Sequence, residues 1–165
     1  MTSAPEVVAA LIAAGTTIAT AESLTGGLLC ATLVDVPGAS AVVRGGVVAY
    51  ATELKAQVLG VDAAALARTG PVDGFVAEEM ARGARSRLRA AVGIATTGVA
   101  GPGPADGFPA GTAFVGIAAD WIEGGARHVR LLVPGDRPAV RAGVVAAALD
   151  EILSALAEHT RPVGS

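Results

Sequence analysis

Apolar residues recur along this chain with a helical period in some segments and as short β-branched runs in others. Near the start, Val7, Val8, Leu11 and Ile12 share one face of a predicted helix, and Gly15 follows as its stop. Further helices are predicted over 28–34, around Lys55 up to Gly60, over 73–90 and over 136–156, and strands over 16–20, 44–50, 92–97, 112–119 and 128–133. Helices and strands therefore alternate for most of the chain.

This alternation predicts an α/β fold, a three-layer α/β/α sandwich around a mixed, mostly parallel sheet. A mixed sheet is expected because only a turn around Gly124 and Gly125 separates the last two strands, which is hairpin spacing. We expect a single domain over 1–165, with its core at about 6–157 and a frayed tail over 160–165.

Composition and charge exclude several classes of protein. Hydrophobic residues make up 52% of the chain and charged residues 16%, which is too apolar for a disordered chain. A net charge of −3 lacks the basic excess of a nucleic-acid binder, so no nucleic-acid partner is expected. No run approaches the ~20 apolar residues of a membrane span, so no membrane partner is expected. The single Cys30 cannot form an internal disulfide, which suits a cytoplasmic location.

Three loops follow predicted strands, where α/β sheets tend to bind ligands. The first carries Ser23 ahead of Gly26 and Gly27, and backbone N–H groups at such a helix start can stabilise an oxyanion or a phosphate. The alternative is a serine that only caps the helix. The second loop leads to Lys55, which can act as a base if it is desolvated. A surface lysine beside Glu53 is the alternative.

The third loop covers 96–104 and holds several glycines and prolines after a buried strand. Its backbone can form a concavity for a phosphate or a ribose, although a rigid turn would have the same composition. The loop lacks the Gly-Lys-Ser/Thr ending of a Walker loop, so it predicts no Walker-type nucleotide site.

Few side chains of this sequence could serve as a base beside Ser23. The two histidines, His128 and His159, lie far from the three loops in sequence and are expected to be structural or surface residues. Cys30 falls on the apolar face of a predicted helix and is expected to be a buried thiol. No His/Cys pair has metal-ligand spacing. Because Lys55 is the chain's one lysine, elimination favours a Ser23–Lys55 pair.

Four motifs follow one another along the chain. They are Ala21-Glu22-Ser23-x-Thr25-Gly26-Gly27, Gly46-Val47-Val48-Ala49-Tyr50-x4-Lys55-x3-Leu59-Gly60-Val61, Thr97-Gly98-Val99-Ala100-Gly101-Pro102 and Pro134-Gly135-Asp136-Arg137. In this order they resemble the CinA C-terminal domain family, whose members include stand-alone nicotinamide-nucleotide amidohydrolases. The resemblance extends from about Glu6 to Leu156, which is nearly the whole chain.

The resemblance implies a three-layer α/β/α fold and hydrolysis of the carboxamide of nicotinamide mononucleotide (NMN). The products would be nicotinate mononucleotide and ammonia, in a step of pyridine nucleotide salvage. Ser23 corresponds to the nucleophile and Lys55 to the general base, with Tyr50 and Thr97 in the same pocket. The implied substrate-binding residues are Thr25, Gly26, Gly27 and Arg137, which match positions suited to the phosphate, and Gly46, Gly98, Ala100 and Gly101. The resemblance implies no metal or other cofactor.

Arg137 suits a phosphate because a guanidinium can bind it in bidentate fashion, and the alternative is an ordinary surface arginine. The sequence departs from the family pattern where Thr52 replaces a usual asparagine, Gly103 a usual aspartate and Phe108 a usual lysine. These departures favour an alternative function, a catalytically silent nucleotide-binding or partner-interaction module on the same scaffold. Hydrolysis of a different amide is a third reading. Base rates for small cytoplasmic enzymes favour a homodimer.

Overall fold

The computed structural model describes residues 1–160, which form five strands and six α-helices. The strands are β1 (Ile18–Glu22), β2 (Val43–Val48), β3 (Val92–Gly98), β4 (Thr112–Ala118) and β5 (Ala126–Leu132). The helices are α1 (Ala4–Ala13), α2 (Leu28–Val34), α3 (Thr52–Gln57), α4 (Ala63–Thr69), α5 (Gly74–Leu88) and α6 (Arg137–His159), and short 3-10 turns lie at Ala39–Ala41 and Glu123–Gly125.

The five strands form one sheet in the order β2-β1-β3-β4-β5. Strand β1 pairs in parallel with both β2 and β3, whereas β4 is antiparallel to β3 on one side and to β5 on the other. Four strands therefore run in one direction and β4 in the opposite one. The predicted mixed, mostly parallel sheet is confirmed, including the hairpin that joins β4 to β5.

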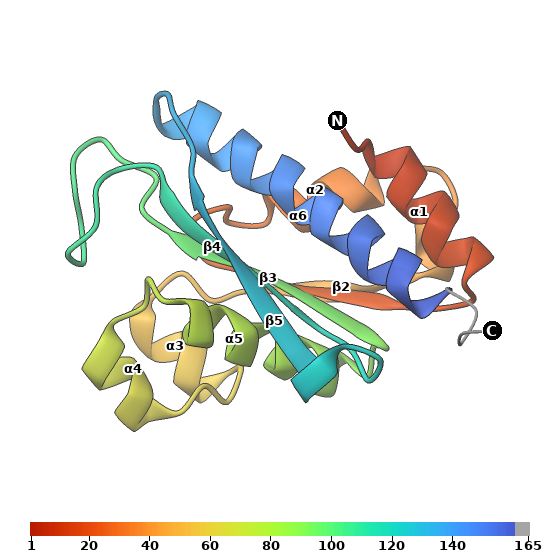
Figure 1. The fold of residues 1–165 in the computed structure, drawn as a ribbon, viewed down its shortest axis with the longest axis horizontal. Helices are drawn as coiled ribbons and strands as arrows, with labels where there is room; N and C mark the ends of the chain where they lie inside the picture. Colours follow the sequence, from red (N-terminus) through yellow and green to blue (C-terminus); the bar gives the residue numbers. More distant parts are fainter. Residues whose placement is uncertain (161–165) are drawn as a thin grey trace.

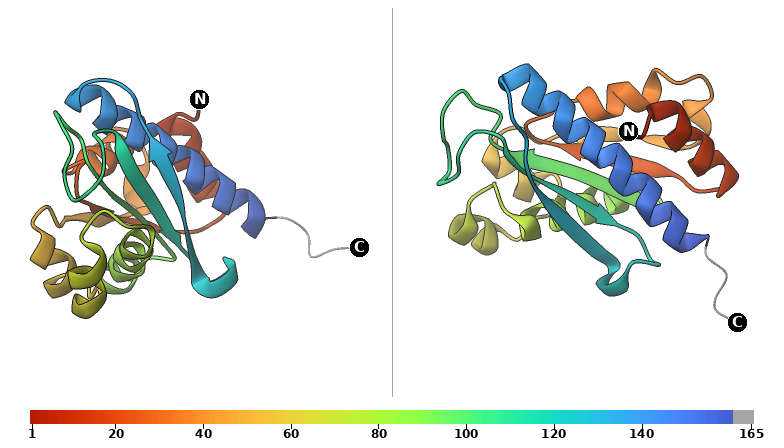
Figure 2. Two further views of the ribbon diagram at one scale, coloured as in Figure 1. Left: turned by 60° about the vertical axis from the view of Figure 1, so that its left-hand side comes forward. Right: turned by 45° about the horizontal axis from the view of Figure 1, so that its top comes forward.

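Helices cover both faces of the sheet (Figure 1), with α1, α2 and α6 on one face and α3, α4 and α5 on the other. Figure 2 shows the same two helical layers from other directions. The core on the α6 side includes the fully buried Leu11, Leu29 and Ile152. The core on the α5 side includes Val76 and Met80, which are also fully buried. The predicted three-layer sandwich is confirmed.

Aspartates start two of the helices, as the sequence predicts. The Asp73 carboxylate accepts hydrogen bonds from the backbone N–H groups of Phe75 at 2.8 Å and Val76 at 3.2 Å, at the start of α5. The Asp136 carboxylate accepts one from the Ala139 N–H at 3.0 Å, at the start of α6. Each cap satisfies N–H groups that have no partner within the first helical turn. These local signals fix where the two longest helices begin.

Two elements show the clearest differences from the sequence-based expectation, and the bounds of several others differ by one to three residues. Helix α4 was not predicted, because its apolar residues are mainly alanines, which give no clear helical stripe; its start is capped by Asp62, whose carboxylate accepts from the Ala64 N–H at 2.9 Å. Strand β1 starts and ends two residues later than the predicted 16–20, because parallel pairing with both neighbours continues to Glu22. Local propensity and capping thus account for α4, whereas pairing with neighbouring strands sets the bounds of β1.

At the carboxyl end of the described chain, α6 reaches His159 and Thr160 caps it, donating its hydroxyl hydrogen bond to the Leu156 carbonyl at 3.1 Å. The rest of the predicted frayed tail, 161–165, lies outside the described residues. Among the helices within residues 1–160, none combines the length and the apolar character needed to cross a bilayer.

Candidate active site

The register of the sheet brings the three candidate loops to one edge. Glu22 pairs with Val48 of β2 on one side and with Thr96 of β3 on the other. Ser23 directly follows Glu22, and Thr97 directly follows Thr96, so the two side chains leave neighbouring strands at the same level. Because β1, β2 and β3 are parallel, their carboxyl ends meet at this edge, where α/β sheets bind ligands.

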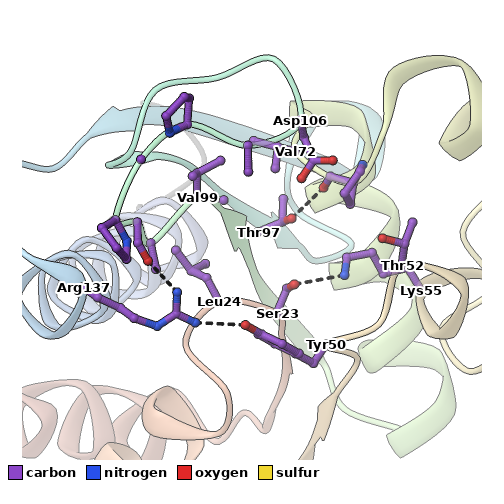
Figure 3. A pocket seen from close by; sticks show the side chains of 18 residues that line it. Ser23, Leu24, Tyr50, Thr52, Lys55, Val72, Thr97, Val99, Asp106 and Arg137 are labelled. Atoms are coloured by element: carbon purple, nitrogen blue, oxygen red, sulfur yellow. Dashed lines mark hydrogen bonds between the residues drawn. The ribbon is translucent and has the colours of Figure 1, made fainter.

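A pocket of about 350 Å³ opens at this edge (Figure 3). Its walls come from the loop after β1, the β2–α3 segment, the stretch before α5, the β3–β4 loop and the first residue of α6. The lining residues are Ser23, Leu24, Tyr50, Thr52, Lys55, Pro71, Val72, Thr97, Gly98, Val99, Ala100, Gly101, Pro102, Gly103, Pro104, Ala105, Asp106 and Arg137. The volume is in the range of small-molecule binding sites.

Ser23 and Lys55 meet at the floor of this pocket. The Lys55 ammonium or amine nitrogen, Nζ, lies 2.9 Å from Ser23 Oγ and donates to the Ala49 carbonyl at 2.8 Å. Lys55 is only 1% exposed and Ser23 8%. The backbone fixes Ser23 as well, because its N–H donates to the Thr96 carbonyl at 3.0 Å. A nucleophile and a base thus lie within hydrogen-bonding distance, as acyl-transfer chemistry requires.

The environment of Lys55 favours its neutral form. Burial lowers the pKa of Lys55 to about 8, and the negative charges of Asp106 and Glu53 oppose this effect in part. A lysine with a pKa near 8 carries an appreciable neutral fraction around neutral pH, which a lysine in water does not. Lys55 can therefore accept a proton from Ser23.

Tyr50 and Arg137 form the opposite wall of the pocket (Figure 3). The Arg137 guanidinium donates to Tyr50 Oη at 2.9 Å and to the Gly101 carbonyl at 2.7 Å. Arg137 is the first residue of α6, and these two hydrogen bonds link it to the segment after β2 and to the segment after β3. Both side chains are exposed, so the guanidinium edge faces a space that solvent or a ligand can enter.

The β3 end and its loop provide another wall. Thr97, 1% exposed, donates its hydroxyl hydrogen bond to the Pro71 carbonyl at 2.6 Å. Gly98 is needed for sheet packing, because a Cβ there would lie 2.6 Å from the Thr112 carbonyl oxygen. Ala100 and Gly101 also line the pocket.

The helix start at 25–27 does not lie in the pocket. The Gly27 N–H and two further α2 N–H groups donate to the Glu22 carboxylate, at 3.0, 3.0 and 2.7 Å, and the Gly26 N–H donates to the Ser23 carbonyl at 3.0 Å. Thr25 is fully buried, its hydroxyl 2.7 Å from that of Thr96. These groups are already bonded within the chain, which corrects the expectation that they hold a phosphate or an oxyanion.

Gly46 also lies outside the pocket. A Cβ at this position would collide with Thr20 Oγ1 and would lie 3.1 Å from Cys30 Sγ, so the glycine permits close packing of β2. Cys30 itself is half-buried, and burial raises its pKa, which disfavours the thiolate. Neither histidine lines the pocket: His128 pairs with Glu78 at 2.7 Å.

Sequence reasoning missed Asp106, which lines the pocket from the tip of the β3–β4 loop. Ala105 and Phe108 exchange backbone hydrogen bonds around Asp106 and Gly107, which have φ values of 52° and 81°. Positive φ at both central residues is the geometry of a type I′ turn, and Asp-Gly is one of its preferred sequences. That dipeptide was the available clue, although it does not say that the turn faces the pocket.

The Leu24 N–H is a second group that sequence reasoning missed. Leu24 lines the pocket, and its N–H has no acceptor among residues 1–160. An N–H on the residue after a nucleophile is well placed to bind an oxyanion formed at that nucleophile. Within the same described residues, no group of three or more His, Cys, Asp or Glu side chains is arranged to hold a metal ion.

Comparison with known proteins identifies relatives of this chain. The family model of the CinA C-terminal domain matches residues 1–156. A CinA-like protein of Frankia casuarinae is 52% identical over 148 residues, covering 89% of this chain and 33% of that protein. A putative competence-damage inducible protein of Desulforamulus reducens is 46% identical over 139 residues, 84% of this chain and 33% of its own length. The chain thus spans about a third of the length of these curated relatives.

Solved structures agree with the sequence comparison. A competence-damaged protein (CinA) superfamily protein of Klebsiella pneumoniae superposes with a TM-score of 0.87 at 37% identity, over 93% of this chain and 95% of that one. A competence/damage inducible protein of Agrobacterium tumefaciens gives a TM-score of 0.85 at 35% identity, over 93% and 92% of the two chains. The sequence and the fold therefore agree, and the chain belongs to the CinA C-terminal domain family.

Proposed function

We propose that this protein hydrolyses the carboxamide of NMN to nicotinate mononucleotide and ammonia, with Ser23 as nucleophile and Lys55 as general base. The observation that carries the proposal is the 2.9 Å contact between Lys55 Nζ and Ser23 Oγ in a buried site. Burial lowers the pKa of Lys55 to about 8, so near neutral pH part of the lysine is neutral and can accept the Ser23 proton.

In the first half of the reaction, neutral Lys55 accepts the Ser23 proton while Ser23 Oγ attacks the carboxamide carbon. The negative charge that develops on the carboxamide oxygen is stabilised by the Leu24 N–H. The Ala49 carbonyl, 2.8 Å from Lys55 Nζ, stabilises the ammonium that forms. Lys55 then gives the proton to the leaving nitrogen, and ammonia departs from the acyl-enzyme.

In the second half, water enters the position that ammonia has left. Lys55, neutral again, removes a proton from this water, and the resulting hydroxide attacks the acyl carbon. The tetrahedral intermediate collapses, and the proton on Lys55 returns to Ser23 Oγ. The product forms as a carboxylic acid, which ionises to the carboxylate and gives its proton to the released ammonia, and the enzyme is restored without any other reactant.

The opposite wall of the pocket suits the phosphate of the nucleotide. The Arg137 guanidinium is held by Tyr50 and Gly101, so it is oriented before a ligand arrives. A planar guanidinium binds phosphate oxygens in bidentate fashion, which a lysine cannot do. Salvage of a cytoplasmic nucleotide requires a cytoplasmic enzyme, so the proposal includes that location.

A second candidate function is a silent nucleotide-binding or partner-interaction module. The β3–β4 loop favours it, because Gly103 and Phe108 stand where the family usually has an aspartate and a lysine. Only the amidohydrolase releases ammonia from NMN. A silent nucleotide-binding module binds NMN without releasing ammonia, and a module that only contacts a partner does neither. A homodimer, expected from base rates, is compatible with either.

The test is ammonia release from NMN by the purified protein, with NMN binding measured by calorimetry on the same samples. Ser23→Ala and Lys55→Ala should abolish turnover, whereas Ser40→Ala, an exposed serine outside the pocket, should retain it. Removing either member of a nucleophile–base pair costs several orders of magnitude in rate. Binding without ammonia release by the unmodified protein would establish the silent module instead. Full turnover by Ser23→Ala would refute the mechanism.

A further inference from the structure

Asp106 is held at the rim of the pocket by a rigid turn. It is at the first central position of the turn that Ala105 and Phe108 close through hydrogen bonds of 3.0 and 2.9 Å. A two-residue turn of this type has little freedom, because both its ends are fixed to each other. The turn therefore fixes the backbone of Asp106, whose exposed side chain lines the pocket.

The turn is itself anchored to the body of the protein. The Phe108 ring packs edge-to-face on Phe114 of β4, with ring centroids 6.3 Å apart. The Arg130 guanidinium lies 5.6 Å from the centre of the Phe108 ring. Phe108 also packs against the cluster that contains Val72 and Val99, two residues of the pocket wall. A phenylalanine at 108 thus keeps Asp106 beside the site.

Three charged side chains line the pocket, those of Lys55, Asp106 and Arg137, and the positive Arg137 and the negative Asp106 lie on different sides of it (Figure 3). Arg137 enters beside Tyr50, whereas Asp106 lies across the pocket from it (Figure 3). Asp106 acts on the Ser23–Lys55 end, since its charge raises the pKa of Lys55 against the effect of burial. The pocket therefore has a cation where the phosphate is proposed to bind and an anion near the reacting amide.

We propose that Asp106 determines specificity by favouring carboxamides carried on a cationic pyridinium ring over the same carboxamides on a neutral ring. The inference rests on the proposed function. In NMN the ring nitrogen is alkylated and positively charged, and the ring is bonded directly to the carboxamide. If the carboxamide carbon contacts Ser23 Oγ, the ring charge must lie within a few ångströms of it, in the field of Asp106.

The same charge explains how the pocket tolerates a cation next to Lys55. When Lys55 is protonated it repels a pyridinium, and Asp106 offsets that repulsion from inside the pocket. Glu53 also acts on Lys55 but is exposed on α3 and does not line the pocket. Glu53 therefore changes the charge near Lys55 without facing the substrate, which makes it the matched control.

The test compares NMN with its reduced form, in which the dihydropyridine ring is neutral, for the unmodified protein, Asp106→Asn and Glu53→Gln. Asp106→Asn should lower kcat/KM for NMN by about tenfold, equivalent to about 1.4 kcal/mol, and that for the reduced form by no more than about twofold. Glu53→Gln should change both by no more than about twofold. An equal loss on both substrates with Asp106→Asn, or the same selective loss with Glu53→Gln, overturns the proposal.

Calorimetric binding separates this proposal from the proposed function. If the unmodified protein binds NMN but releases no ammonia, the amidohydrolase proposal fails. The effect of Asp106 on the preference for the cationic ring is then measured by comparing the dissociation constants of NMN and of its reduced form. Asp106→Asn should then weaken NMN binding by about tenfold and leave binding of the reduced form nearly unchanged. Equal binding of the two ring forms by the unmodified protein would overturn the role of Asp106 whether or not turnover is found.

Discussion

Replacing Lys55 by methionine should make the protein more stable and inactive. Burial lowers the pKa of Lys55 to about 8, against about 10.4 for lysine in water. At about 1.36 kcal/mol per pH unit, this difference costs the folded state about 3 kcal/mol at pH 7. Methionine keeps a similar apolar stem and removes the amine, but it leaves the Ala49 carbonyl without its donor, which costs about 1 kcal/mol. Lys55→Met should therefore be more stable than the unmodified protein by about 2 kcal/mol at pH 7.

The pH dependence gives the sign of the effect. The unfolded chain binds the lysine proton more tightly than the folded chain, so stability rises with pH between the two pKa values. The destabilisation by Lys55 is complete below about pH 8 and is lost as the pH approaches about 10.4. The advantage of Lys55→Met over the unmodified protein should therefore disappear between these pH values.

Urea unfolding measured by far-UV circular dichroism at about pH 7, 8.5 and 10 provides the assay. The difference between the two proteins cancels groups that they share, including Cys30, whose pKa is raised by burial. A free-energy difference that stays constant across this pH range would refute the reasoning, because it would show that Lys55 is not held in a site that disfavours its charge. A Lys55→Met protein less stable than the unmodified one at pH 7 would refute it as well.

Three further predictions concern the site and its support. If neutral Lys55 is the base, kcat/KM for NMN should rise about tenfold per pH unit up to about pH 8 and then level off, and a flat profile from about pH 6 to 8 would contradict this. Glu22→Gln should lower the unfolding free energy by about 2–4 kcal/mol in urea titrations, since the carboxylate accepts hydrogen bonds from three N–H groups at the start of α2, that of Gly27 included; a loss below about 0.5 kcal/mol would be inconsistent with that role. Gly46→Ala should cost about 1–3 kcal/mol through contact with Thr20 and Cys30, and an unchanged melting temperature would show that β2 has room for the methyl group.

The sequence by itself determined the features that depend on residues close to one another in the chain. The periodic apolar stripes predicted most helices and strands, and Asp73 and Asp136 marked where α5 and α6 begin. A helix start is readable because a capping side chain bonds to N–H groups only two or three residues away. The pairing of Ser23 with Lys55 was predicted by elimination, since the chain has one lysine, and the fold brings the two atoms to 2.9 Å.

The tertiary structure alone decided which groups are free to act. The sequence predicted an anion-binding site at the N–H groups that start α2, yet in the fold these groups donate to the Glu22 carboxylate. No local sequence pattern indicated that Asp106 belongs to the site, because the packing of Phe108 on Phe114, which keeps the loop beside the pocket, joins residues of different elements. Burial and hydrogen-bond occupancy depend on neighbours that are distant in sequence, so local patterns cannot report them. For the same reason the pKa of Lys55 became a property of the site only once the chain had folded around it.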